Sequence, residues 1–199
     1  MHKFIFLLPT ILLMSGVTSC NVPHKHPKVM EYAVAEIQGT SADSQIRGTV
    51  TFLEIKNDLK ISAEIEGAPP GKHGFHIHEF GAVTNGGKDA GGHYNPVDTG
   101  HGMVIEDGKH HAHIGDLGNI EIGEDGSGSA ERWLKGVSLA GSEFSVAGRA
   151  VIIHEKIDDF GQPTGNAGGR IAAGSILLVK QVISPKEKAS EESEELEKK

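Results

Sequence analysis

The chain has 199 residues, a length that fits one domain of about 100–200 residues with additional tails. Its 27 glycines and its aromatic content of 5% favour a loop-rich, all-β domain over a helical one. The net charge of −8 argues against binding of nucleic acid, because phosphates repel an acidic surface.

The chain begins with a segment typical of an exported protein. Lys3 supplies a positive charge, Phe4–Met14 form an apolar run too short to cross a membrane comfortably, and SGVTSC follows. This last stretch resembles a bacterial lipoprotein cleavage box. We therefore predict a signal peptide over 1–19 and a lipidated Cys20 that anchors the protein to a membrane of the cell envelope, on its periplasmic side or outer surface. The alternative is an ordinary signal peptide followed by an incidental cysteine.

The next segments predict a tether and then strands. Residues 20–29 are polar, contain two prolines and are expected to form the tether. Alternation of apolar and polar residues begins near Tyr32 and recurs in QIRGTVTFLEIK and DLKISAEIEG. The last two runs meet at Lys56-Asn57-Asp58, which predicts a β-hairpin.

A histidine-containing strand and a long loop follow. In GKHGFHIHEFG, His76 and His78 are two residues apart, so a strand would point both imidazoles to one face. The periodicity then disappears between Gly81 and Gly118, and a loop of this length in a compact domain needs something to order it. Metal binding would do so, because imidazole suits copper and zinc and a carboxylate completes a typical zinc set. The candidate ligands in this loop are His93, His101, His113 and Asp116.

Strand patterns return in the second half of the chain. They occur in NIEIGEDGSGSAERWL, in VSLAGSEFSVAGRAVIIHEK, which contains His154, and in RIAAGSILLVKQV. Together the runs predict about eight short strands in a domain spanning 30–183, with the Greek-key connections of a barrel or an immunoglobulin-like sandwich. Residues 184–199 carry many charges and no large apolar face, so we predict a disordered tail.

Five segments resemble the copper/zinc superoxide dismutases in content, order and spacing. They are GFHIHEFG, GGHYNP, GDLGN, VIIHEKIDD and GNAGGRIAAG. The resemblance implies a flattened eight-stranded Greek-key β-barrel with long loops that hold copper and zinc. Transferred by position, the copper ligands are His76, His78, His93 and His154. The zinc ligands are His93, His101, His113 and Asp116, so that His93 bridges the two metals.

The resemblance also implies a function, the dismutation of superoxide to dioxygen and hydrogen peroxide. Copper would change oxidation state, the redox-silent zinc would order the loop, and His93 would act both as ligand and as proton donor. Asp158 corresponds to an aspartate that links the two sites through hydrogen bonds from ligand histidines. Arg170 corresponds to an arginine beside the copper that meets the superoxide anion. The alternatives are a solvated loop acid for Asp158 and a surface arginine for Arg170, whereas His73, His110 and His111 are interpreted as turn or loop residues.

The chain departs from the family pattern at two linked positions. The family ties its long loop to the strand after the arginine with a disulfide, but the corresponding residues here are Gly87 and Ala173. The only cysteine is Cys20, so no intramolecular disulfide can form. Loss of such a bridge could lower stability by about 2–5 kcal/mol and leave Arg170 less firmly held. The segment from Asp159 to Arg170 is also short and lacks lysine.

Three functions compete at this point. The first is the dismutase enzyme, and the second is an envelope lipoprotein that buffers or delivers copper with little turnover. The third is a structural module that binds only zinc. The enzyme is favoured because a zinc module has no need for His76, His78 or His154, and a delivery protein would be expected to offer soft sulfur ligands. Phe80, Gly81 and the Ile171–Val179 strand permit a homodimer.

Overall fold

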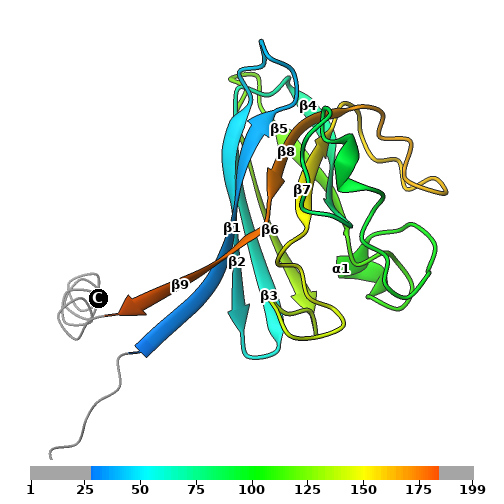
Figure 1. Ribbon diagram of the computed structural model, residues 1–199. Helices are drawn as coiled ribbons and strands as arrows, with labels where there is room; N and C mark the ends of the chain where they lie inside the picture. Colours follow the sequence, from blue (N-terminus) through cyan, green and yellow to red (C-terminus); the bar gives the residue numbers. More distant parts are fainter. Residues whose placement is uncertain (1–27, 184–199) are drawn as a thin grey trace, which may run out of the picture.

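The computed structural model describes residues 28–183, and its regular secondary structure is almost entirely β-strand (Figure 1). The strands are β1 (Lys28–Gly39), β2 (Arg47–Ile55), β3 (Asp58–Glu66), β4 (Gly71–His78), β5 (Asp116–Ile122), β6 (Gly128–Lys135), β7 (Ala150–His154), β8 (Arg170–Ser175) and β9 (Leu177–Ile183). The 3-10 helix η1 (Lys88–Ala90) and the helix α1 (Val104–Asp107) interrupt the long loop between β4 and β5. No helix in this part of the chain is long and apolar enough to span a bilayer.

The strands curl into an almost closed antiparallel barrel. Hydrogen-bonded neighbours follow the order β5-β4-β7-β8-β1-β2-β3-β6. Because β3 neighbours β6 while β4 lies between β5 and β7, the connections between β3 and β4 and between β6 and β7 cross the ends of the barrel in Greek-key fashion. The predicted all-β Greek-key barrel is therefore confirmed. The predicted hairpin is also present, since β2 and β3 pair up to Ile55 and Asp58.

A side chain links β5 and β6, the two strands at the ends of the strand order. Arg132 of β6 donates from Nε to the carbonyl oxygen of Leu117 at 2.9 Å and from Nη2 to that of Asn119 at 2.6 Å. These carbonyl groups of β5 would otherwise need another partner or water. Arg132 thereby fixes the strand whose first residue, Asp116, is a candidate zinc ligand.

The burial of the strands explains why the histidines sit deep in the molecule. On β2, Val50 and Phe52 are fully buried while their neighbours are partly exposed, which is the pattern of a strand with one face on the core. By contrast, the last six residues of β4 and all five residues of β7 are buried. These two strands lie under the long loops in Figure 1, so their outer faces are covered as well. The histidines on them consequently occupy a site shielded from water.

The ends of the described chain form a two-stranded arm. The first half of β1 pairs with β9 from Lys28 opposite Ile183 to Val34 opposite Leu177. In Figure 1 this arm leaves the barrel on the side away from the loops around α1. The last predicted strand is thus two strands, β8 and β9, separated at Ile176. Strand β1 starts at Lys28, inside the segment predicted as a tether, whereas the signal peptide, Cys20 and the charged tail lie outside the described residues.

Candidate metal centre

Three neighbouring elements bring four histidines together. His76 and His78 lie on β4, which pairs with β7, and His154 is the last residue of β7. His93, from the long loop, forms an isolated β-bridge with His78. Each of these side chains is buried, and one ring nitrogen from each lies within 4.8 Å of the others. The four copper ligands predicted from the sequence therefore form one compact group.

The second predicted group is equally compact and shares His93 with the first. A ligand atom from each residue lies within 4.8 Å of the others, and all four residues are buried: His93, His101, His113 and Asp116. Asp116 lies at the centre of this group. Its Oδ1 is 2.8 Å from Nδ1 of His93 and 3.1 Å from Nδ1 of His113. Its Oδ2 is 2.9 Å from Nδ1 of His101, although that pair is not aligned for a hydrogen bond.

Asp158 connects the two groups. Its Oδ2 lies 2.8 Å from Nε2 of His76, and its Oδ1 lies 2.9 Å from Nε2 of His101. Asp158 is only 1% exposed, so the alternative of a solvated loop acid does not describe its surroundings. Gly165 makes this approach feasible, because a Cβ atom there would lie 1.9 Å from Oδ1 of Asp158. The carboxylate fixes the outer nitrogen of one histidine in each group.

The hydrogen bonds of the first group leave nitrogen lone pairs that suit a cation. His78 and His154 face backbone carbonyl oxygens through Nδ1, at 3.0 Å from Gly91 and 3.3 Å from Gly168, so Nδ1 carries the proton in each neutral ring. Their Nε2 atoms are then both unprotonated, yet they lie only 3.3 Å apart. His76 donates from Nε2 to Asp158, and its Nδ1 is buried without a hydrogen-bond partner. A metal ion fits this arrangement, because it would accept the lone pairs of all three rings.

The electrostatics of the two groups differ. Burial lowers the pKa of His76 to about 4 and that of His154 to about 3, which keeps both rings neutral and able to coordinate. Burial also lowers the pKa of His101, but the carboxylates of Asp116 and Asp158 outweigh it and raise that pKa to about 9. The metal-free protein therefore holds a proton on His101 where the metal-bound protein would hold a cation.

Arg170 lies beside the first group at the start of β8. Its Nη1 and Nη2 each lie 2.5 Å from a backbone carbonyl oxygen, those of Gly87 and Gly91. A Cβ atom on Gly87 would contact the Arg170 side chain at 3.5 Å, so the place where the family has a cysteine is packed against the arginine itself. The side chain is thus held by two carbonyl groups in the absence of a disulfide.

The sequence did not predict the structural roles of three residues near the site, and for one of them, His73, the predicted role was wrong. His73 is not a turn residue: it lies in β4, is 4% exposed, and its two ring nitrogens contact the carbonyl oxygens of His154 and Pro69 at 2.9 and 2.8 Å. Asn119 and Gln162 hold the backbones of site residues, and isolated amides give no signal of this kind in a sequence. His110 and His111 are exposed, as predicted.

Comparison with known proteins agrees with this geometry. The model of the family described as copper/zinc superoxide dismutase (SODC) matches residues 46–176. The chain belongs to this family. The family match and the relatives described below confirm the prediction, made from the sequence, of a superoxide dismutase enzyme that uses copper and zinc as cofactors.

Individual relatives are similar over most of the chain. An extracellular copper/zinc superoxide dismutase of Brugia pahangi is 40% identical over 148 residues, which cover 69% of this chain and 72% of that protein. An extracellular copper/zinc superoxide dismutase of Caenorhabditis elegans is 42% identical over 147 residues, which cover 70% of this chain and 65% of that protein. The crystal structure of the clock protein EA4 superimposes with a TM-score of 0.65 at 36% identity, covering 74% of this chain and 94% of that one.

The ionisation of the site predicts how stability of the metal-free dismutase depends on pH. His101 has a raised pKa, so its contribution is complete below about pH 6.5 and is lost as the pH rises through about 9. His76 and His154 have lowered pKa values, so their contribution is present above about pH 6.5 and is lost as the pH falls toward 4 and 3. The free energy of unfolding, measured with urea, should therefore peak near pH 6.5. A value that stays constant or rises between pH 6.5 and 9 would contradict the assignment for His101.

Proposed function

We propose that the chain converts superoxide into dioxygen and hydrogen peroxide at a copper that shares His93 with a zinc. The observation that carries the proposal is the membership of one buried imidazole, His93, in both donor groups. A copper ion bound by His76, His78, His93 and His154 would supply one-electron oxidation and reduction. The second group suits zinc, because zinc binds imidazole and carboxylate donors and does not change its oxidation state. Its members are His93, His101, His113 and Asp116.

His93 would have two tasks in this reaction. Its Nδ1 faces Asp116 at 2.8 Å, so this nitrogen belongs to the proposed zinc side and Nε2 is the atom left for the copper side. Nε2 would hold a proton whenever it is not a ligand and would donate it to the reduced oxygen species, while the second proton of hydrogen peroxide would come from water. Asp158 would keep the two sides in register, because its hydrogen bonds fix the orientation of His76 and His101.

Arg170 would provide the positive charge that draws the anionic substrate inward. The protein is acidic overall, so attraction of superoxide requires a local cation at the site. Arg170 is held near His78, since the carbonyl group of Gly91 contacts both side chains. Lys109 is an unsuitable substitute, because its Nζ donates to the carbonyl oxygen of Gly136 at 2.9 Å and lies over the ring of Phe144.

We further propose that the protein acts outside the cytoplasm, held to a membrane by a lipid on Cys20. The apolar segment before Cys20 supports export, and the two relatives described above are named as extracellular enzymes. The sequence SGVTSC supports lipid attachment rather than release.

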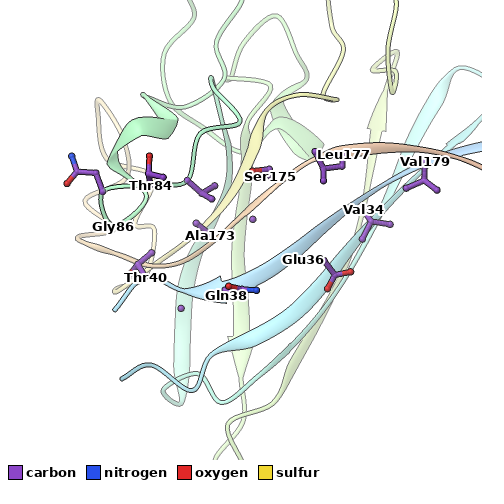
Figure 2. A pocket seen from close by; sticks show the side chains of 14 residues that line it. Val34, Glu36, Gln38, Thr40, Thr84, Gly86, Ala173, Ser175, Leu177 and Val179 are labelled. Carbon is purple, nitrogen blue, oxygen red and sulfur yellow. The ribbon is translucent and has the colours of Figure 1, made fainter. Parts of the chain in front are cut away.

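We also propose that two copies of the chain associate through the hollow between β1, β8 and the loop after β4 (Figure 2). Its volume is about 670 Å³, and Glu36 is the only charged residue among those that line it. Apolar side chains from the neighbouring strands β1 and β9 gather at one end, including Val34, Leu177 and Val179. Leu177 is 63% exposed and lies opposite Val34, so these side chains form an apolar patch that a twofold axis would let cover itself.

Substitution of Arg170 tests the proposed reaction. Arg170→Gln should lower kcat/KM for superoxide at least tenfold, equivalent to about 1.4 kcal/mol, while copper and zinc contents stay at the wild-type level. Salt should slow the wild type more than the variant, since screening weakens attraction beyond about 10 Å at 0.1 M. Superoxide decay and metal content are measured on the same reconstituted samples. Wild-type protein that binds both metals but does not accelerate decay would favour a metal-binding lipoprotein with little turnover.

Substitution of Cys20 tests the anchor. Wild-type protein from cells should partition into the detergent phase and yield a mature terminus that begins at a lipid-modified Cys20. Cys20→Ala should move the protein into the aqueous phase, because a lipid chain supplies about 0.8 kcal/mol for each buried methylene group. Equal partitioning and an identical mature terminus, determined by mass spectrometry, would exclude lipid attachment.

Substitution of Leu177 tests the dimer. Leu177→Asp places a charge at the centre of the proposed apolar contact and should convert the protein from dimer to monomer in light-scattering measurements. Ile55→Asp is the matched control, because Ile55 is also an exposed apolar residue but lies at the β2–β3 hairpin, outside the hollow. A wild-type protein that is monomeric at micromolar concentration would contradict the proposal.

A further inference from the structure

Two amide side chains hold the backbones of site residues in the same manner. Asn119 of β5 accepts from the N–H of Asp158 at 2.7 Å and donates to its carbonyl oxygen at 2.9 Å. Gln162 accepts from the N–H of His101 at 3.0 Å and donates to its carbonyl oxygen at 2.8 Å. Each amide therefore acts as a clamp that satisfies both polar groups of one residue.

The clamp by Gln162 connects two loops at the proposed zinc side. Gln162 belongs to the short loop between β7 and β8, and His101 belongs to the long loop between β4 and β5. Among the described residues, no other hydrogen bond reaches the backbone of His101. The position of this histidine thus depends on Gln162 for its backbone and on Asp116 and Asp158 for its ring.

The loop that carries Gln162 is well suited to hold it in place. Asn166 donates to both carboxylate oxygens of Asp159 at 3.1 Å, and the backbone N–H of Gly165 donates to Gly161 at 2.6 Å. Gln162 lies inside this cross-linked turn, four residues after Asp158. The ring of Phe160, from the same turn, lies nearly parallel to that of His101 with the ring centroids 6.4 Å apart. One turn therefore contacts His101 through its backbone and its ring.

We infer that Gln162 is a positioning residue for the zinc side of the centre. By holding the backbone of His101, it slows the dissociation of the metal from this ligand. The inference rests on the proposed assignment of His101 as a zinc ligand. A ligand with a free backbone can swing out with its loop, whereas a ligand clamped at both backbone polar groups must break those two bonds first. The clamp also supplies a link between the two loops in a protein that lacks the disulfide of its family.

The test is the rate at which zinc leaves the reconstituted full-length protein when a colorimetric chelator is added in excess. Gln162→Ala removes both hydrogen bonds and should release zinc roughly tenfold faster than the wild type, given the net strength of ordinary hydrogen bonds. Gln162→Glu keeps the acceptor for the N–H of His101 but places a carboxylate oxygen against its carbonyl oxygen, so it should also release zinc faster than the wild type. Copper content should be the same in all three proteins.

The control is Thr164→Ala, an exposed residue of the same turn whose side chain makes no hydrogen bond within the described residues. Its zinc should leave at the wild-type rate. Cobalt(II) bound in place of zinc gives a second readout, since its visible spectrum should change in Gln162→Ala and not in Thr164→Ala.

Equal release rates for the wild type and Gln162→Ala would overturn the inference. So would a lower melting temperature of metal-free Gln162→Ala accompanied by an unchanged release rate, because that outcome describes a purely structural residue. Failure of the proposed function is distinguishable, since it would be seen as wild-type protein that holds zinc without accelerating superoxide decay.

Discussion

The carboxylate of Asp158 is the interaction on which the rest of the site depends. It is buried, it accepts from His76 of the barrel and from His101 of the long loop, and its own backbone is fixed by Asn119 of β5. Burial raises the pKa of Asp158, but the hydrogen bonds from His101 and His76 outweigh it and lower that pKa below its usual range. A permanently ionised Asp158 directs the inner nitrogen of His76 and that of His101 toward the two donor groups.

The barrel supplies rigidity, and the long loop between β4 and β5 supplies the remaining residues of each donor group. β4 and β7 are buried on both faces and present His76, His78 and His154 from neighbouring strands. The loop after β4 has little regular structure, so its order comes from polar contacts at the site, in particular those around Asp116. Glycine at position 165 permits the close approach of Asp158 to His101, and the guanidinium group of Arg170 binds the carbonyl groups of Gly87 and Gly91. Hydrogen bonds therefore hold the site together in a chain that cannot form an intramolecular disulfide.

Local patterns predicted the strands well, because alternation along β2 and β3 reflects one face on the core, and the Lys56-Asn57 turn marks their hairpin. The residues that the sequence proposes as copper ligands, and those that it proposes as zinc ligands, each form one compact group in the structure. Local patterns could not predict contacts between residues that lie far apart in the sequence. The clamp between Gln162 and His101 spans 61 positions, and the bond between His73 and the carbonyl of His154 spans 81. The division of the last strand at Ile176 likewise depends on its two different contacts with β1.

The most direct test of the central claim is X-ray diffraction from crystals of the copper- and zinc-reconstituted protein, recorded on both sides of each metal's absorption edge. One copper peak is expected among Nδ1 of His76 and Nε2 of His78, His93 and His154. One zinc peak is expected beside Asp116 and His101, with the ring of His93 between the two peaks and the carboxylate of Asp158 contacting neither metal. A single peak, or two peaks that do not share His93, would contradict the account.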